Sequence, residues 1–119
     1  MIDDAEFDLI YPLAGRVVDG RRVLDRVPNR GSIAASLNSY KILPGIREVS
    51  LDLFEQPPTR TQRTKALADE IAASKTIAPL IVVIDEVGPY ILEGAHRYDA
   101  LKILDATSFP ALVVIEKEI

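Results

Sequence analysis

Two basic side chains, His96 and Arg97, directly follow Gly94 at a point where the sequence pattern changes from strand to helix. Residues 90–92 are typical of the end of a strand, and after Gly94 the apolar residues recur at helical spacing. The first turn of a helix carries partial positive charge, which disfavours a cation there by roughly 0.3–1 kcal/mol. A bound phosphate would satisfy both side chains and the free backbone N–H groups together. We therefore interpret this turn as a candidate anion-binding site.

Each residue of this turn also has an ordinary structural explanation, and the sequence leaves both open. Gly94, followed by Ala95, lets the backbone approach a phosphate, but a plain strand-to-helix turn also uses the freedom of glycine at positive φ. The alternative to a phosphate clamp by His96 and Arg97 is a surface arginine beside a histidine bonded to a local carbonyl. Tyr98 is expected to pack its ring on the core, with a ligand contact as the alternative. Glu93 is expected to pair with Arg97, to hold Mg²⁺ beside the phosphates or to act as a base.

The composition excludes several classes of chemistry. The chain has 119 residues, a length typical of one domain and sufficient to bury a core without disulfides. It has no cysteine, which removes disulfides, thiolate zinc sites and cysteine nucleophiles. No run of about 18 apolar residues is present, so no membrane-spanning helix is expected. The acidic first residues argue against a signal peptide, and these features together predict a cytoplasmic protein.

The net charge of −4 is unevenly distributed along the chain. Residues 1–15 carry four acids and no Lys or Arg, residues 16–65 carry ten bases against five acids, and residues 66–119 carry four against nine. The segment charges are therefore −4, +5 and −5. An acidic chain with a basic middle is not a general nucleic-acid-binding surface, although it is compatible with a compact anion.

The pattern of apolar residues predicts strands and helices along the whole chain. The Asp19-Gly20 pair between apolar pairs predicts a hairpin over residues 16–24, and Thr61 is expected to cap a helix. Helices among both parallel and hairpin-linked strands predict a mixed α/β fold with helices packed on a sheet. The other expected elements are a strand over 7–14, a helix over 32–40, a strand over 49–53, a helix over 62–74, a turn over 76–79, buried strands over 80–84 and 109–115, a strand over 90–92 and a helix from Ala95.

Three blocks in the second part of the chain have the order and spacing of a known family. They are Val49-Ser50-Leu51-Asp52-Leu53 with Gln56-Pro57, Ala66-Leu67-Ala68-Asp69-Glu70-Ile71 with Ala78-Pro79-Leu80-Ile81-Val82, and Glu93-Gly94-Ala95-His96-Arg97-Tyr98-Asp99-Ala100. Through these blocks, residues 46–115 resemble the N-terminal domain of ParB and its relatives, the ParB/sulfiredoxin superfamily. Residues 1–45 match no part of that family. We therefore expect an N-terminal extension, a hairpin plus a short helix, packed on a sulfiredoxin-like domain at residues 46–119.

The resemblance implies a protein that handles a nucleotide. In ParB the third block binds the phosphates of CTP, whereas in sulfiredoxin and the ParB-like free-serine kinases a box ending in His-Arg-Tyr handles ATP or ADP. The present box, Gly94-Ala95-His96-Arg97-Tyr98, has the same ending. Ala95 stands where sulfiredoxin needs its cysteine, so sulfiredoxin chemistry is not expected.

The resemblance also implies roles for residues outside the box. In the serine kinases an acidic residue just after the opening strand is the catalytic base, and Glu55 is nearest to that place. A solvated loop acid is the alternative. Arg63 lies at the start of a helix where the family often places basic residues near the ligand, with a solvated helix-end charge as the alternative. Residues 76–79 are expected to border the nucleotide base, and Mg²⁺ is expected to accompany the nucleotide.

The expected function is therefore binding of a nucleoside di- or triphosphate, with possible hydrolysis or phosphoryl transfer to a small hydroxyl acceptor. One alternative is a non-catalytic module that binds DNA or a protein partner. A ParB-like nuclease is the other, although no acidic cluster at metal-ligand spacing supports it. Nucleic acid is not expected for this domain alone, a membrane is not expected, and a protein partner stays open.

Overall fold

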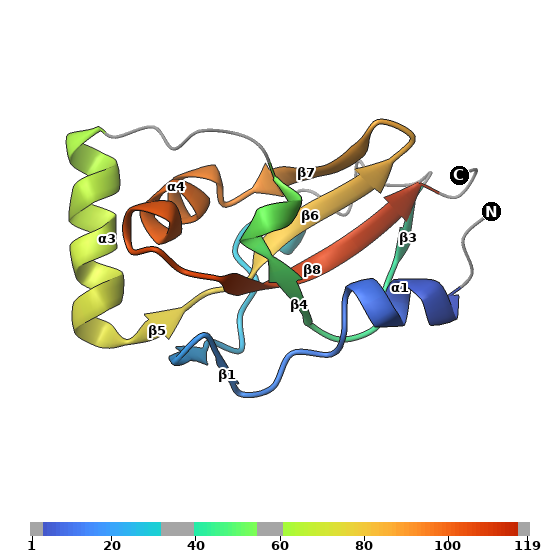
Figure 1. Cartoon of the computed structure of the whole chain (residues 1–119), viewed down its shortest axis with the longest axis horizontal. Helices are drawn as coiled ribbons and strands as arrows, with labels where there is room; N and C mark the ends of the chain where they lie inside the picture. Colours follow the sequence, from blue (N-terminus) through green and yellow to red (C-terminus); the bar gives the residue numbers. More distant parts are fainter. Residues whose placement is uncertain (1–3, 32–39, 55–60, 117–119) are drawn as a thin grey trace.

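The structure, a computed structural model, describes residues 4–31, 40–54 and 61–116 (Figure 1). Its elements in chain order are α1 (Asp4–Ile10), β1 (Val17–Val18), β2 (Arg21–Val23), β3 (Tyr40–Ile42), β4 (Arg47–Ser50), the 3₁₀ helix η1 (Leu51–Leu53), α3 (Gln62–Ser74), β5 (Thr76–Ile77), β6 (Leu80–Asp85), β7 (Gly88–Glu93), α4 (Ala95–Ile103) and β8 (Ser108–Glu116). Within these residues, no helix combines the length and the apolar character that crossing a bilayer requires.

The larger sheet is built around β8, which has strands on both of its edges. Its order is β3-β8-β6-β7, and β4 shares the β3 edge of β8 (Figure 1). Strands β6 and β8 are parallel, whereas the other pairs are antiparallel. Both strands of the parallel pair are buried almost throughout, as their continuous apolar runs predicted. The predicted mixed α/β fold is confirmed.

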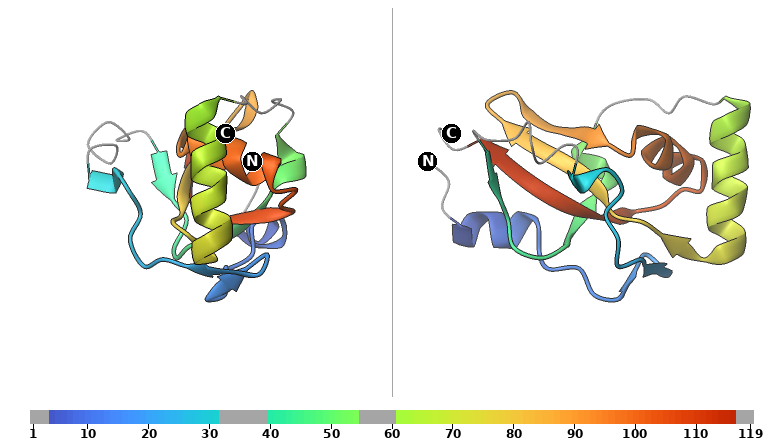
Figure 2. Two further views of the ribbon diagram at one scale, coloured as in Figure 1. Left: turned by 90° about the vertical axis from the view of Figure 1, so that its left-hand side faces the viewer. Right: turned by 180° about the vertical axis from the view of Figure 1, so that it is seen from behind.

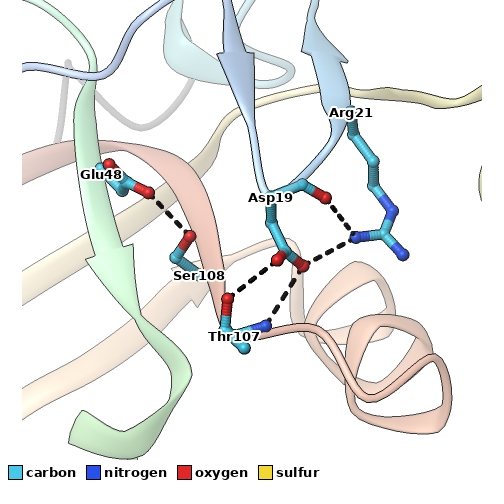
Figure 3. Close-up of polar contacts among 5 residues, drawn as sticks. All are labelled: Asp19, Arg21, Glu48, Thr107 and Ser108. Atoms are coloured by element: carbon cyan, nitrogen blue, oxygen red, sulfur yellow. Dashed lines mark hydrogen bonds and ion pairs between the residues drawn. The ribbon is translucent and has the colours of Figure 1, made fainter.

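The predicted hairpin is also confirmed, and it belongs to a second sheet of order β1-β2-β5. Asp19 and Gly20 have φ values of 52° and 77°, both left-handed as in a type I′ turn. The Asp19 carboxylate accepts hydrogen bonds from Arg21 Nη1 at 2.9 Å and from the backbone N–H and hydroxyl of Thr107 at 3.2 and 2.8 Å (Figure 3). These contacts attach the hairpin turn to the residue that precedes β8.

The segment at residues 76–79, which was expected to be a turn, begins instead with the strand β5. Its partner is β2, which runs parallel to it. The Arg22 N–H donates to the carbonyl of Lys75 at 2.8 Å, and the Leu24 N–H donates to that of Ile77 at 2.9 Å. Local sequence could not predict this strand because its partner lies far earlier in the chain.

The core lies mainly on one face of the larger sheet, where α1, α3 and α4 all contribute buried side chains. The Tyr98 ring lies beside those of Phe54 and Phe109, with centroids 5.6 and 6.4 Å away. The opposite face buries a smaller apolar cluster, which consists of Ile81, Val83, Leu112 and Val114. Figure 2 shows β3 and the segment around residue 30 on the side of the sheet opposite to α4.

The strand predicted over residues 7–14 is wrong, because the chain forms α1 there. Phe7 and Tyr11 lie one helical turn apart, are both 4% exposed and stack with ring centroids 6.4 Å apart. Leu9 and Ile10 point away from the core and are 84% and 47% exposed. The pattern failed because the segment is apolar on both faces, so its composition alone did not reveal the helical period.

Two other predicted elements differ from the structure. The strand expected over 49–53 is shifted, since β4 ends at Ser50, whose hydroxyl accepts a hydrogen bond from the Asp52 N–H at 3.2 Å and starts η1. Of the helix predicted over 32–40, residues 32–39 lie outside the described residues. Tyr40 is the first residue of β3 and pairs with Glu116, so it belongs to a strand rather than to a helix.

Arg47 is a buried cation that joins β4, of which it is the first residue, to α1. Its residue exposure is 4%, and its Nη1 donates to the Asp8 carboxylate and to the carbonyl of Tyr11, the latter at 3.1 Å. Its Nε donates to the carbonyl of Pro44 at 3.0 Å. A buried guanidinium needs such partners because burial without them is costly.

The N-terminal residues share the core of the rest of the chain. Phe7, Tyr11 and Leu43 belong to the main buried cluster, and β3 pairs with β8. The predicted division into residues 1–45 and 46–119 stays a prediction.

Replacing Arg47 by leucine is expected to lower the free energy of unfolding by about 3 kcal/mol, because it removes the donor from two carbonyls and one carboxylate. Urea denaturation measures this loss. The control is Arg26→Leu, since Arg26 is exposed and should change stability by only about 0.5 kcal/mol. Equal losses in both variants would show that the Arg47 contacts are not stabilising.

Candidate functional site

The candidate site begins where β7 turns into α4 at Gly94. This residue has φ of 100°, in the left-handed region. A Cβ on Gly94 would lie 2.6 Å from Leu80 Cγ and 3.0 Å from Arg97 Nη2. The predicted need for glycine therefore has two independent physical causes, the backbone conformation and the close approach of Leu80 at the start of β6.

The start of α4 presents backbone donors without a side-chain cap. Among the described residues, no side chain caps the helix at Gly94, and its first turn holds no acid. The first intrahelical bond is donated by the Tyr98 N–H to the Gly94 carbonyl at 2.9 Å. The N–H groups of Ala95, His96 and Arg97 precede that bond and therefore lack intrahelical acceptors. Ala95 and His96 are exposed, so this end of the helix is accessible from solvent.

Arg97 makes contacts that the sequence did not predict. Its Nη1 donates to the backbone carbonyls of Ala78 at 2.9 Å and Pro79 at 2.8 Å, which join β5 to β6. Burial lowers the pKa of the guanidinium, and the nearby Glu93 carboxylate partly counteracts this shift. The side chain remains a cation at neutral pH, since arginine keeps its proton in proteins. Arg97 thus attaches the start of α4 to the segment before β6.

Glu93 is held by a residue from the N-terminal part of the chain. The Asn29 side-chain amide donates to Glu93 Oε1 at 2.9 Å, across 64 positions of sequence. Asn29 has φ of 62°, a value that asparagine tolerates better than most residues. Sequence reasoning missed this contact, because no local signal identifies so distant a partner.

Tyr98 lies in the core, as the interpretation of this residue as a packing residue predicted. It is 1% exposed, and Lys102 Nζ lies 5.7 Å from its ring centroid. Burial raises the pKa of its hydroxyl, and the charge of Asp99 adds to the effect. The predicted core packing is confirmed, and a ligand contact by Tyr98 stays a prediction.

The remaining predicted site residues are not joined to the turn by any described contact. Arg63 is exposed on the first turn of α3, whose cap is the predicted Thr61; the Thr61 hydroxyl accepts from the Thr64 N–H at 3.2 Å. Glu55, the predicted catalytic base, lies outside the described residues. The roles of Arg63 and Glu55 therefore stay predictions. No group of three or more metal-binding side chains occurs among the residues that the structure describes.

Comparisons with known proteins add one structural likeness. No protein-family model matches the chain, and no curated protein matches it. A solved structure that is similar is the crystal structure of sulfiredoxin from Arabidopsis thaliana, at 25% sequence identity and a TM-score of 0.49. The match covers 59% of this chain and 84% of that one. A likeness this low carries no argument about activity, so the proposals below rest on contacts within this chain.

Gly94→Ala is expected to destabilise the protein more than Gly88→Ala, by about 1–3 kcal/mol. Both glycines have left-handed φ values, 100° and 127°, so both alanines are strained. Only the Cβ at position 94 meets other atoms within 4 Å, because nothing lies that close to a Cβ at Gly88. Thermal or urea unfolding of the two variants measures the difference. A loss no larger for Gly94→Ala would mean that the Leu80 contact relaxes freely.

Proposed function

We propose that the turn at residues 93–98 binds the phosphates of a nucleoside di- or triphosphate, namely ATP, ADP or CTP. The start of α4 carries this proposal, since a histidine and an arginine stand in its first turn where no described side chain caps the helix. A phosphate supplies the acceptors that these backbone N–H groups lack, and its charge offsets that of Arg97 and of the helix dipole.

Arg97 has two functions in this proposal. Its Nη1 stays on the carbonyls of Ala78 and Pro79 and fixes the side chain in place. Its Nε and Nη2 have no recorded acceptor among the described residues and are assigned to the phosphate. Fixing the guanidinium in advance reduces the entropy that is lost when the phosphate binds. His96, which is exposed, supplies a second donor.

Glu93 is the residue that fits a magnesium ion in this site. Magnesium is typically bound by one or two carboxylates together with substrate phosphates and water. One Glu93 oxygen accepts from Asn29, and that contact orients the carboxylate at the end of β7. The ion would neutralise phosphate charge when the nucleotide is bound.

The chemistry that we propose is hydrolysis or phosphoryl transfer to a small hydroxyl acceptor. In the transfer, Glu55 takes the proton of the acceptor hydroxyl, the hydroxyl oxygen bonds to the terminal phosphorus, and the shortened nucleotide leaves with the electrons of the broken P–O bond. Reduction of a cysteine sulfinic acid, the sulfiredoxin reaction, is not proposed, because this chain has no cysteine to serve as its thiol.

His96→Ala is expected to weaken nucleotide binding about tenfold or more, because a hydrogen bond to a charged group contributes about 1.5–3 kcal/mol. Calorimetric titration of ATP, ADP, CTP and GTP, each with and without Mg²⁺, measures the change. Arg97→Ala is expected to abolish binding, and it also removes the contacts to Ala78 and Pro79. His96→Ala is therefore the cleaner test. The matched control is Arg26→Ala, an exposed cation outside the turn. Wild-type protein that binds none of the four nucleotides would refute the proposal.

Glu55→Gln is expected to lower turnover about 100-fold or more while nucleotide affinity is unchanged, because only the proton acceptor is lost. Release of inorganic phosphate, with and without a panel of small hydroxyl acceptors, measures turnover, and titration measures affinity. Nucleotide binding without turnover in the wild type would instead support the non-catalytic module. Unchanged turnover in the variant would exclude Glu55 as the base.

A further inference from the structure

The second face of the larger sheet carries a groove that has no part in the proposed nucleotide site. This face buries Leu112 and its neighbours, and Val27, Tyr40 and Ile46 pack against them from the segment before residue 30 and from β3 and the loop that follows it (Figure 2). Three hollows lie in series, with volumes of about 370, 450 and 450 Å³.

Shared lining residues make these hollows one groove. The first hollow, lined by Arg22, shares Arg16, Val23 and Asp25 with the second, which Leu13 lines. The second shares Asp25, Gly45 and Ile46 with the third, which Arg30 lines. A ligand that fills the groove would therefore be extended rather than compact. No residue of the turn at 93–98 lines any of the three hollows.

Three arginines that make no ion pair with a described acid line this groove. Arg16 and Arg22 line one end and Arg30 lines the other, and all three are exposed. Among the described residues they form no ion pair, in contrast to Arg21 with Asp19 and Arg47 with Asp8. Asp25 is the only carboxylate among the described residues that line the groove. The groove therefore carries a net positive charge on a chain whose net charge is −4.

The part of the groove between the cations is apolar and partly open to water. Leu13 is 67% exposed and Ile42 is 37% exposed, while Leu112 lies at the bottom of the third hollow and is 4% exposed. Exposed apolar side chains that line a concave surface next to charges are typical of a protein-recognition site.

We propose that this groove binds an extended acidic segment of a partner protein. The carboxylates of the segment pair with Arg16 and Arg22 at one end and with Arg30 at the other, and its apolar side chains cover Leu13 and Ile42. Arginine suits this role because its planar fork binds a carboxylate through two hydrogen bonds.

Two other occupants fit the groove less well. A nucleic acid would bring phosphates against Asp25, and the described lining residues include no aromatic side chain for bases to stack on. A second copy of this chain would have to offer an acidic apolar segment, and α1 is the described candidate. Its Asp8 already pairs with Arg47, and Glu6 also has a partner within the fold.

The test is a selection of random displayed peptides on the full chain, followed by fluorescence anisotropy with the enriched peptides made synthetically. We expect enrichment of peptides in which Asp or Glu flank apolar residues. The affinity of such a peptide should fall about tenfold or more in the double variant R16E/R30E, because both ends of the groove change sign. It should also fall in Leu13→Glu. The matched control is Arg26→Glu, which reverses an exposed neighbouring charge outside the groove and should leave affinity nearly unchanged.

Several outcomes would overturn the proposal. The selection could enrich no peptide, or it could enrich peptides that contain no Asp or Glu. The affinity could also fall as much in Arg26→Glu as in R16E/R30E. Binding of single-stranded oligo(dT) that the double variant removes would assign the groove to nucleic acid. Self-association of the wild type, seen by sedimentation and removed by R16E/R30E, would assign it to a second copy. Circular dichroism of each variant ensures that a loss of binding is not a loss of fold. The result is independent of nucleotide binding, which neither the double variant nor the control should alter.

Discussion

The turn at Gly94 brings the end of β7, the start of α4 and the start of β6 into contact. Because Gly94 has no Cβ, Leu80 and the Arg97 guanidinium can approach its backbone closely, and Arg97 in turn donates to the carbonyls of Ala78 and Pro79. These contacts fix the direction of α4 relative to the parallel strands β6 and β8. The proposed phosphate site therefore depends on the same atoms that join the helix to the sheet, and its donors are positioned before any ligand arrives.

The arginines of this chain show how one residue type serves different purposes. Arg47 is buried and bonded to α1 and to the carbonyl of Pro44, so it serves stability. Arg97 is partly buried and, among the described residues, only its Nη1 has acceptors, which suits a residue that both supports a turn and binds an anion. Arg16 and Arg30 are exposed beside a groove and make no ion pair among the described residues. Partners and burial, rather than the charge itself, distinguish these roles.

Sequence patterns predicted the parts of the fold that depend on local chemistry. The Asp19-Gly20 turn, the Thr61 cap and the apolar runs of β6 and β8 all lie where they were expected. The errors occurred where distant residues decide. Residues 7–14 are apolar enough for a strand, but the core receives Phe7 and Tyr11 from one helical face, and β5 exists only because β2 lies beside it.

The sequence by itself determined the mixed α/β class, the strand–turn–helix at Gly94 and the presence of a histidine and an arginine in the first turn of that helix, because these follow from local spacing and conformational preference. Only the tertiary structure decided what the polar side chains contact. The carbonyls that hold Arg97, the amide of Asn29 that holds Glu93, and the groove between Arg16 and Arg30 all join segments that are distant along the chain. Such pairs depend on how the sheet and helices pack, and no local pattern encodes that packing.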